Sequence, residues 1–407
     1  MIAIARALQA GGRKVVLVAA ERYLPLAERA GLQTRSLVSE EVFSRAIDDH
    51  NLWHPRKGLK VIFGAAAQGF LDEHYDFITT KYQRGKTLLV SHVLDFAGRV
   101  FRDAHPDVAF CSVVPAPALL RSLNEPPRLT RLGLEQMLPR LFVSMGYRYA
   151  DRIIDSLAAP AINRLRARVS LPPVRRVLDR WWISPDLTLG LFPDWFSVPD
   201  IDLPSGMECV GFPLADSGDL LTSTSDQSNQ EVIARLGEQK PIVFAPGSAH
   251  THAKKFLAAA ARACESLGLP GLLISSVDSQ FPKKLPDNVF TANYMPFRQL
   301  LPRARAIVHH GGIGTTSQAL AVGLPQLVLP MAFDQFDNAS RVEKLGCGRW
   351  MPMASATPRR MAKRLKEILN DPHVDNAVKR VAVRMSGQQL KPDYLAKIVL
   401  THFSGQI

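Results

Sequence analysis

The second half of the chain alternates between short apolar runs and longer segments whose apolar residues recur at helical spacing. Short apolar runs bounded by glycine, proline and polar residues are typical of buried strands, whereas the longer segments predict helices. The predicted strands are 242–245, 271–275, 289–294, 306–308, 325–331 and 348–352, and the predicted helices include 254–267, 297–303 and 357–370. Strands that alternate with helices indicate a parallel sheet with helices on both faces.

The first half shows a similar alternation, but it begins with a helix. Residues 1–10 carry apolar residues at helical spacing and end at Gly11-Gly12, before a strand at 14–20. An α/β domain of this kind normally starts with a strand that leads into such a helix. We therefore expect that either the true start lies upstream or the first strand has been lost. The other predicted elements are a helix at 24–30, strands at 33–37, 86–91, 108–114, 186–192 and 208–212, mostly helices over 39–83, and a long basic helical region over 121–182.

Residues 215–231 are rich in serine, threonine, aspartate and glutamine and contain few apolar side chains. Such a composition is typical of a linker. We therefore expect an N-terminal domain over 1–214 and a C-terminal domain over 232–385, with further helical structure over 386–407. Both domains are predicted to be of the α/β class.

Composition is that of a globular enzyme. The chain has 407 residues, enough for two domains, of which 46% are hydrophobic and 21% charged. No apolar run approaches the roughly 18 residues that a membrane-spanning helix needs, and the first 20 residues show no signal-peptide cleavage site. The 4 cysteines are scattered, which argues against disulfides and a zinc site and favours a reducing cytoplasm.

The net charge of the chain indicates which kinds of partner it could bind. The chain has 50 lysines and arginines against 37 acidic residues, a net charge of +13, and this favours nucleotide phosphates, nucleic acid or an acidic membrane surface. No nucleic-acid-binding module is recognisable, so nucleic acid is not an expected partner. Arginines over 164–180 adjoin Trp181 and Trp182, which suggests a peripheral contact at the inner membrane face. The simpler alternative is an exposed helix face whose tryptophans pack in the core.

A glycine-rich turn follows the predicted strand at 306–308. The sequence HHGGIGTT ends this strand and opens a helix that is predicted to begin at Thr315 or Thr316. Glycines let backbone N–H groups approach a ligand closely, and a helix start adds unpaired donors and a partial positive charge. Together these features predict an anion site, most simply for a phosphate. The next strand leads into a predicted polar loop that holds Asp334, Gln335, Asp337 and Asn338.

Four short motifs mark the C-terminal half. They are PGSA, PF-x-x-LLP, HHGG-x-GT and DQ-x-DNA, at Pro246–Ala249, Pro296–Pro302, His309–Thr315 and Asp334–Ala339. In combination they resemble the nucleotide-sugar signature of the family 1 glycosyltransferases, in particular bacterial members of the rhamnosyltransferase and sterol glucosyltransferase type. The resemblance implies the GT-B fold, with two Rossmann-like domains whose parallel sheets face across a cleft, and a C-terminal helix within 386–407 that returns to the N-terminal domain.

The same resemblance implies a hexosyltransferase. Its C-terminal domain is expected to bind a UDP- or dTDP-sugar, and its N-terminal domain a lipophilic acceptor. His310 is expected against the diphosphate, with Gly312, Gly314 and Thr315 as backbone and hydroxyl donors and Ser248 facing the phosphate from a neighbouring turn. The alternatives are a strand-end histidine bonded to backbone and an ordinary turn serine.

The nucleoside and the sugar are assigned in the same way. Tyr294 matches an aromatic that stacks on the base, Met295 offers backbone bonds to the base edge, and Gln318 stands where many relatives bond the ribose. Asp334 and Gln335 are expected to bond the sugar hydroxyls, since a carboxylate accepts and an amide both donates and accepts. The alternatives are a core aromatic for Tyr294, an exposed helical glutamine, and an ordinary surface loop for the acid–amide pair.

The catalytic base is not evident. In related proteins the loop before the first helix supplies it, so the base is expected upstream of Met1. His92, at the carboxyl end of a predicted strand, is a second candidate, beside the alternative of a loop histidine without chemistry. No acidic metal-binding motif lies near the donor residues, so we expect no metal and no cofactor. The resemblance implies transfer with inversion, through direct attack by an acceptor oxygen.

Two other functions stay open. Nucleotide-sugar epimerases share the fold and the donor, but they need several carboxylates in the cleft, and no such cluster is evident. A catalytically impaired nucleotide-sugar-binding remnant or subunit is the other alternative, because the first strand is expected to be missing.

Overall fold

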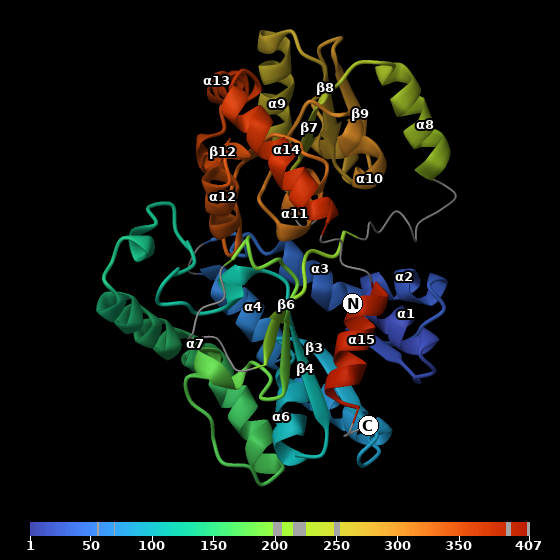
Figure 1. Cartoon of the computed structure of the whole chain (residues 1–407), viewed down its shortest axis with the longest axis vertical. Coiled ribbons are helices and arrows are strands. Elements are labelled where there is room, and N and C mark those ends of the chain that lie inside the picture. The colour runs from blue at the N-terminus through green and yellow to red at the C-terminus, as the bar shows by residue number, and fades with distance from the viewer. Residues whose placement is uncertain are drawn as a thin grey trace. The chain divides into compact units, whose positions relative to one another are not determined.

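The computed structural model describes residues 1–54, 57–68, 70–197, 206–214, 225–247, 253–387 and 392–404. The chain divides into two compact units (Figure 1). Unit 1 consists of Met1–Pro127, Leu132–Pro213 and Leu390–Ile407, and unit 2 of Arg128–Arg131 and Leu214–Gln389. Each unit is built around parallel strands, as the α/β pattern predicts.

Unit 2 contains one six-stranded sheet in the order β12-β11-β10-β7-β8-β9. All five strand pairs are parallel. The strands are β7 (Ile242–Ala245), β8 (Gly271–Ile274), β9 (Val289–Ala292), β10 (Ala306–His309), β11 (Gln326–Val328) and β12 (Gly348–Trp350). Every residue of β7 and β10 is buried, as expected for central strands covered on both faces.

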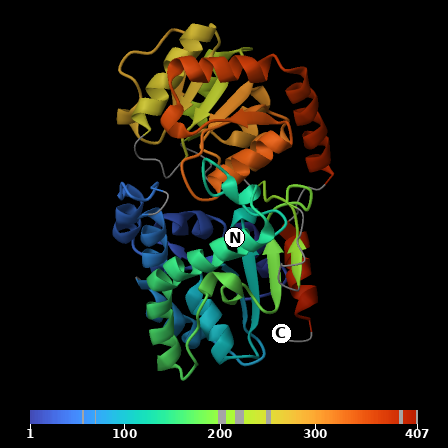
Figure 2. The ribbon, with the colours of Figure 1, turned by 90° about the vertical axis from the view of Figure 1, so that its left-hand side faces the viewer.

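Helices cover both faces of this sheet (Figures 1 and 2). On one face α9 and α13 pack together, and on the other α8, α10 and α11 contribute to a hydrophobic cluster around Leu272 and Ile307. The helices of unit 2 are α8 (Ser225–Leu236), α9 (Lys254–Leu267), α10 (Phe297–Leu300), α11 (Ile313–Ala321), α12 (Gln335–Lys344), α13 (Pro358–Leu369) and α14 (Pro372–Ser386). Thr357 caps α13 as the sequence predicts, because its side chain accepts a hydrogen bond from the Arg360 N–H.

The strand order of unit 2 reverses between β7 and β10. Chain order runs outward through β8 and β9 on one side, and through β11 and β12 on the other. In open parallel sheets ligands bind beyond the carboxyl ends of the strands at such a reversal, since the connections diverge there and leave a crevice. Pro246 and Gly247 follow β7, and His310 and Gly311 follow β10, so the motif residues lie at this reversal.

Unit 1 contains two separate parallel sheets. Four strands pair in the order β3-β4-β5-β6, and β1 pairs with β2 alone. The strands are β1 (Val16–Ala20), β2 (Gln33–Val38), β3 (Leu88–His92), β4 (Ala109–Val114), β5 (Leu187–Gly190) and β6 (Met207–Cys209). Within the described residues β1 and β3 each pair on one side only. The sheet structure of unit 1 is thus interrupted between β1 and β3 in the part of the chain that the structure describes.

Helices surround both sheets of unit 1. They are α1 (Ile2–Ala10), α2 (Leu24–Arg29), α3 (Glu40–Asp48), α4 (Lys57–Gln68), α5 (Leu71–Lys81), α6 (Phe96–Ala104), α7 (Arg140–Arg168) and α15 (Pro392–His402). The last helix, α15, packs against α1 through Val399 and Phe403, in one cluster with Ile4 and Leu8. Chain ends far apart in sequence therefore share one core.

Three predicted boundaries are wrong. The predicted linker at 215–231 overlaps α8, which begins at Ser225, and the long helical region at 121–182 contains an α-helix only over Arg140–Arg168. Helix α11 begins at Ile313, earlier than predicted, because Gly312 is its N-cap residue. The Thr316 hydroxyl donates to the Gly312 carbonyl 3.0 Å away inside the helix.

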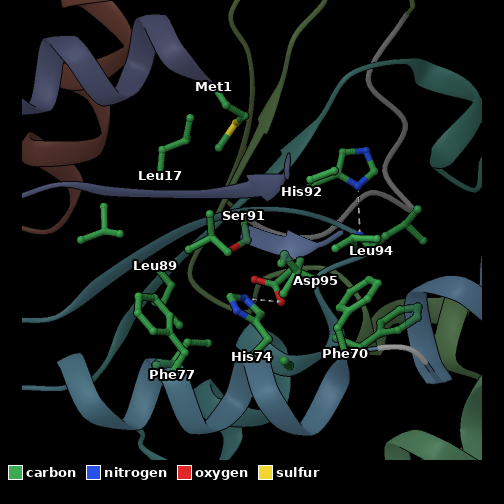
Figure 3. A pocket seen from close by; sticks show the side chains of 18 of the residues that line it. Met1, Leu17, Phe70, His74, Phe77, Leu89, Ser91, His92, Leu94 and Asp95 are labelled. Atoms are coloured by element: carbon green, nitrogen blue, oxygen red, sulfur yellow. Dashed lines mark hydrogen bonds and ion pairs between the residues drawn. The ribbon is translucent and has the colours of Figure 1, made fainter. Parts of the chain in front are cut away.

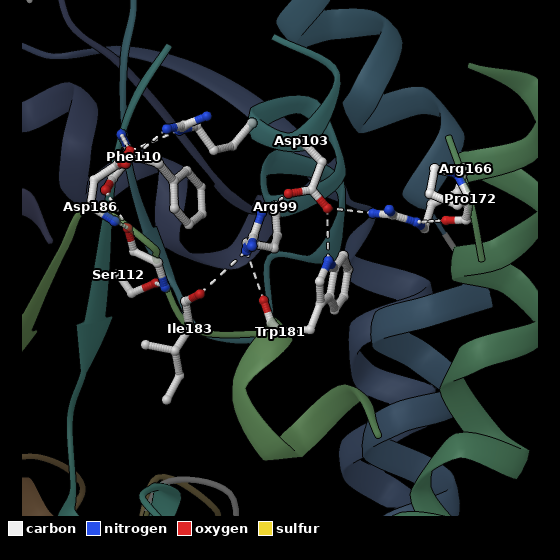
Figure 4. A network of polar contacts seen from close by, with 11 residues as sticks. Arg99, Asp103, Phe110, Ser112, Arg166, Pro172, Trp181, Ile183 and Asp186 are labelled. Atoms are coloured by element: carbon white, nitrogen blue, oxygen red, sulfur yellow. Dashed lines mark hydrogen bonds and ion pairs between the residues drawn. The ribbon is translucent and has the colours of Figure 1, made fainter. Parts of the chain in front are cut away.

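One arginine of the cluster beside the tryptophans, Arg166, faces the interior of unit 1 (Figure 4), whereas Arg164, Arg168, Arg175 and Arg176 are exposed. Asp103 accepts hydrogen bonds from Arg99, Arg166 and the Trp181 indole, the last at 2.8 Å. Arg166 is 4% and Trp182 also 4% exposed. Buried arginines need such partners because an uncompensated buried charge is costly. Trp182 and the Trp181 indole nitrogen are therefore turned inward, while the membrane contact suggested for this segment stays a prediction.

Candidate functional site

The His310 ring lies between two glycines at the reversal of the unit 2 sheet. A Cβ atom on Gly247 would lie 2.6 Å from Cε1 of this ring, and one on Gly312 would lie 2.5 Å from its Nε2. Both distances are shorter than real Cβ contacts, so a larger residue at either position would displace the ring. Gly247 also has φ of +102°, a conformation that other residues rarely adopt. The two motifs PGSA and HHGG thus cooperate to place one imidazole.

The other two glycines of the turn have different roles. Gly311 has φ of +95°, and a Cβ atom there would lie 2.9 Å from Val328 and 3.0 Å from the Gln335 carbonyl oxygen. This glycine therefore lets the turn pass close to β11 and α12. Gly314 lies in the first turn of α11 and is exposed, and no atom lies within 4 Å of the position that a Cβ atom would take there. Its open side is free for a ligand to approach the backbone.

His309 is a structural residue. It is 0% exposed, its Nδ1 accepts a hydrogen bond from the Gly311 N–H at 3.1 Å, and its Nε2 lies 2.9 Å from Oε1 of Gln326. Because a backbone N–H can only donate, the ring proton must be on Nε2 and is donated to Gln326. Burial, with a smaller effect of His310, lowers the pKa of His309 to about 3. A neutral imidazole thus holds the glycine turn in place.

The start of α11 supplies backbone donors. The N–H groups of Ile313, Gly314 and Thr315 have no acceptor within the helix, since the first intrahelical bond is from the Thr316 N–H to the Gly312 carbonyl. Together with the helix dipole they attract an anion. Thr315 is half-buried, and Gln318, one turn further along α11, is half-buried as well. The expected phosphate-binding residues therefore share one helix end.

The predicted polar loop is wrong, because Gln335 and Asn338 lie in the first turn of α12 and Asp334 is its N-cap residue. Gln335 is 3% and Asn338 0% exposed. The run of polar residues suggested a loop exposed to solvent, but these side chains form hydrogen bonds within the protein. The Asn338 amide donates to the Gly311 carbonyl at 2.9 Å and to Asp334 at 2.8 Å. Asn338 thereby joins the start of α12 to the glycine turn before α11.

Asp334 and Gln335, the acid–amide pair, differ in charge and in the contacts that they make. Burial raises the pKa of Asp334 to about 6, although the Asn338 hydrogen bond acts in the opposite direction. Phe333, directly before it, has φ of +56°, a strained conformation for a bulky residue and one that recurs at functional sites. Oε1 of Gln335 accepts from the Met331 N–H at 2.9 Å, so this oxygen supports the turn. The Gln335 amide nitrogen has no partner among the described residues and remains for a ligand.

The structure gives less detail on the other residues that are expected to bind the nucleotide sugar. Tyr294 and Met295 follow β9 at the same carboxyl edge of the sheet, two strands from β7. Tyr294 is half-buried, and the Met295 side chain is a core residue with 2% exposure, so only its backbone is available for a base edge. Ser248 lies outside the described residues. Within the described ranges no group of three or more histidine, cysteine, aspartate or glutamate side chains could hold a metal ion.

Unit 1 has a pocket of about 840 Å³ between the unpaired edges of β1 and β3 (Figure 3). Its lining is mostly apolar and includes Leu17, Leu89 and Phe77. Ser91 and His92 line it at the end of β3. His92 is exposed, and its Nδ1 accepts a hydrogen bond from the Leu94 N–H at 3.1 Å. Only the other ring nitrogen of His92 is therefore available for proton transfer.

A histidine–carboxylate pair that the sequence analysis missed also lines this pocket. Nε2 of His74, on α5, lies 3.3 Å from Oδ1 of Asp95, the N-cap residue of α6. Burial acts to lower the pKa of His74, but the Asp95 charge and hydrogen bond outweigh it and the net pKa is raised. Burial acts to raise the pKa of Asp95, and His74 with donors from Gly98 and Ser91 lowers it overall. The two residues are 21 positions apart, so no local motif could have signalled the pair.

Comparisons with known proteins find glycosyltransferase relatives. Residues 273–400 match the family described as "Erythromycin biosynthesis protein CIII-like, C-terminal domain". A 3-alpha-mycarosylerythronolide B desosaminyl transferase of Saccharopolyspora erythraea is 36% identical over 115 residues, which are 28% of this chain and 26% of that protein. A PGL/p-HBAD biosynthesis glycosyltransferase of Mycobacterium tuberculosis is 28% identical over 242 residues, or 59% and 54% of the two chains. The chain thus spans between about a quarter and a half of these curated relatives.

Solved structures extend the likeness to both units. The crystal structure of the glycotransferase of kitacinnamycin superposes with a TM-score of 0.72, covering 98% of this chain and 94% of that chain at 18% sequence identity. At this identity the likeness shows the fold alone. The matched domain and the relatives support the resemblance to the family 1 glycosyltransferases, and the solved structures show that the chain has the GT-B fold.

Proposed function

We propose that the protein transfers a hexose from a UDP- or dTDP-sugar to a hydroxyl group of a lipophilic acceptor. The observation that carries this proposal is the placement of His310 between Gly247 and Gly312, beside the open start of α11. A sugar transferase must stabilise the negative charge that a nucleoside diphosphate gains as it leaves. Preorganised N–H donors and an imidazole supply that stabilisation in this arrangement.

The diphosphate is proposed to lie over Gly314, where the backbone is open. Its oxygens would accept from the free N–H groups of Ile313, Gly314 and Thr315, while His310 bonds from the strand side. The sugar would then reach the start of α12, where the Asp334 carboxylate accepts from one hydroxyl and the Gln335 amide nitrogen donates to another. Tyr294, Met295, Gln318 and Ser248 are proposed to bind the nucleoside and the phosphate, as the resemblance implies. The proposed donor site requires no metal ion and no cofactor.

The acceptor is proposed to be apolar because two kinds of observation favour it. One relative is named for transfer to an erythronolide, a macrolide ring, and the pocket of unit 1 is lined mainly by apolar side chains. Transfer is proposed to invert the anomeric centre by direct attack of the acceptor oxygen. The base stays unassigned, with His92 as a candidate within the described residues.

A titration of the purified protein with nucleotide sugars tests this function. Isothermal calorimetry should show one site for UDP-glucose or a dTDP-hexose and much weaker binding of GDP-mannose. With donor and a mixture of macrolide and lipid hydroxyl acceptors, mass spectrometry should show an added hexose. Binding without transfer would favour the impaired nucleotide-sugar-binding subunit. Conversion of the donor alone to an epimer, seen by NMR, would instead favour the epimerase.

A further inference from the structure

An exposed apolar surface runs along the first half of α7 and the turn before it. Five large side chains on α7, Leu141, Phe142, Met145, Tyr149 and Ile153, are between 40% and 68% exposed. They recur at spacings of three, four and seven residues, so they lie on one side of the helix. We define the α7 surface as these five residues together with Arg148 and Arg152, which lie between them in the sequence.

The opposite side of the same helix is fixed to unit 1. Val143 and Ile154 are buried, and Asp151 is 3% exposed. Asp151 pairs with Arg121 and with Arg176, the latter at 3.0 Å. The large apolar side chains of α7 therefore point outward, because the opposite side of the helix is held against unit 1 by the ion pairs of Asp151 and by the packing of Val143 and Ile154. Figure 1 shows these first turns projecting from unit 1.

The turn before the helix continues the α7 surface. Leu132, Leu134 and Met137 are 71%, 55% and 81% exposed. An apolar patch of this extent is uncommon on a soluble monomer and marks an interaction site. No described helix of the protein is long and apolar enough to cross a membrane, so a membrane contact here would lie along the bilayer surface.

The charges around the α7 surface indicate which kind of partner would bind it. Arg140, Arg148 and Arg152 are exposed, and none of them forms an ion pair with a described residue. Between Gln136 and Ile154 the only acidic residue is Asp151, which is buried. A second copy docked by two-fold symmetry would place arginines against arginines with no acid to compensate. An anionic surface would meet both the cations and the apolar side chains.

We propose that the α7 surface docks on an anionic lipid bilayer, with its apolar side chains in the interfacial region and its arginines at the headgroups. This contact goes beyond the proposed sugar transfer and does not depend on it. It places the membrane contact on the first half of α7, apart from the segment at 164–182 for which the sequence suggested it. Docking there would hold the enzyme at the layer in which a lipophilic acceptor dissolves.

Sedimentation with lipid vesicles, without any nucleotide sugar, tests the proposal. The full chain should bind phosphatidylcholine vesicles that contain phosphatidylglycerol, and bind pure phosphatidylcholine at least about tenfold more weakly. Raising the salt concentration should weaken binding, since exposed charges are screened. The combined change Arg148→Glu and Arg152→Glu should lower binding at least about 25-fold, because each arginine near an anionic surface contributes about fivefold.

A second variant, with its own control, tests the apolar side chains of the α7 surface. The combined change Leu141→Gln, Phe142→Ser and Met145→Gln should lower vesicle binding at least about tenfold and leave the melting temperature unchanged, since these side chains are exposed. Val383→Gln with Tyr394→Ser is the matched control, as these side chains are 73% and 54% exposed on other helices, and it should bind like the unchanged protein.

Two results would overturn the proposal. One is vesicle binding that is equal in the unchanged protein and in the α7 variants. The other is a dimer of the unchanged protein, seen by light scattering, that the apolar variant converts to a monomer while neither binds vesicles. In that case the surface would serve a second copy. Loss of donor binding in calorimetry would refute the sugar transfer and leave this result standing.

Discussion

The proposed donor site of unit 2 and the pocket of unit 1 both lie at parallel strands, yet they differ in how completely the protein fills them. In unit 2 the sheet is continuous, and the His310 ring fits between two glycines with no room for a methyl group. In unit 1 the sheet is interrupted, and about 840 Å³ of space separates β1 from β3. The closely fitted site is made of short sequence motifs, whereas the open pocket is lined by residues from distant segments.

This difference suggests where the specificity of each unit arises. A fitted site keeps its polar groups in one geometry, which suits the invariable diphosphate of every donor. An open apolar pocket imposes few directional contacts, and it can therefore accommodate chemically diverse apolar groups. The following predictions test whether function in unit 2 depends on this close fit and whether unit 1 tolerates change.

The largest effect is expected for His310→Ala. Loss of the imidazole should lower kcat/KM for transfer about 100-fold or more, the size typical of removing one preorganised charge-stabilising group. The melting temperature should change little, because the ring is only half-buried. His373→Ala, an exposed histidine at the start of α14, is the matched control and should behave like the unchanged enzyme. Equal kinetics in the two variants would remove His310 from the site.

A second prediction concerns the space around that ring. Gly312 has φ of −61°, which alanine adopts without strain, so Gly312→Ala should act only through the ring it displaces. We expect about a tenfold loss in donor affinity and a destabilisation of about 1–3 kcal/mol. Combined with His310→Ala, the same change should cost less than about 0.5 kcal/mol, since the clash is gone. Additive effects in calorimetry and thermal unfolding would contradict the fit described here.

A third prediction follows from the buried carboxylate at Asp334. Its folded-state pKa of about 6 lies above the ordinary value of 3.8, so folding favours the protonated form. The stabilising contribution is therefore complete below pH 3.8 and is lost as the pH rises through about 6. Asp334→Asn should be more stable than the unchanged protein at about pH 8, by on the order of 1 kcal/mol, and this advantage should shrink at about pH 5.

The same variant should bind the donor at least about tenfold more weakly, because an uncharged amide replaces a carboxylate that accepts from a sugar hydroxyl. Chemical unfolding at the two pH values and donor titration at the higher one provide the two measurements. A variant that is less stable at the higher pH would show that Asp334 is a stabilising structural residue and would weaken its assignment to the sugar.

The smallest effect is expected in unit 1. His92→Ala should lower transfer less than about threefold, because one ring nitrogen already bonds the Leu94 backbone and the side chain is exposed. Donor affinity should not change. A loss of about 100-fold or more with unchanged donor affinity, accompanied by loss of the acidic limb of the pH–rate profile, would identify His92 as the base. Unit 1 would then contain a fitted catalytic group after all.

Much of unit 2 could be predicted from the sequence because its signals are local. The end of a strand, the glycine turn and the start of a helix follow one another within HHGGIGTT, and neighbouring atoms leave no room for a side chain at Gly311 or Gly312. What could not be predicted was how the polar residues are used. The hydroxyl of Thr316 bonds inside α11, and Asn338 bonds a carbonyl 27 residues earlier in the sequence. Such contacts depend on tertiary neighbours that composition does not reveal.

Unit 1 was predicted less completely for the same physical reason. The interrupted sheet follows from the order of a helix and a strand near the start, which the apolar pattern shows. The pairing of His74 with Asp95, and the inward direction of Trp182, depend on how α5, α6 and α7 pack. The outward apolar side of α7 also contradicts the usual rule that apolar stripes face the core, so a periodic pattern alone could not assign its direction.

Among the residues that the structure describes, β1 and β3 each have one unpaired edge, and these edges have a practical consequence. A strand edge exposes a ladder of backbone donors and acceptors that any extended chain can match, and proteins generally protect such edges against self-association. Here two edges face one cavity, so a segment from a neighbouring molecule would gain hydrogen bonds on both sides at once. We expect concentrated preparations of this protein to form oligomers whose abundance grows steeply with concentration and falls with mild denaturant, independently of nucleotide and of lipid.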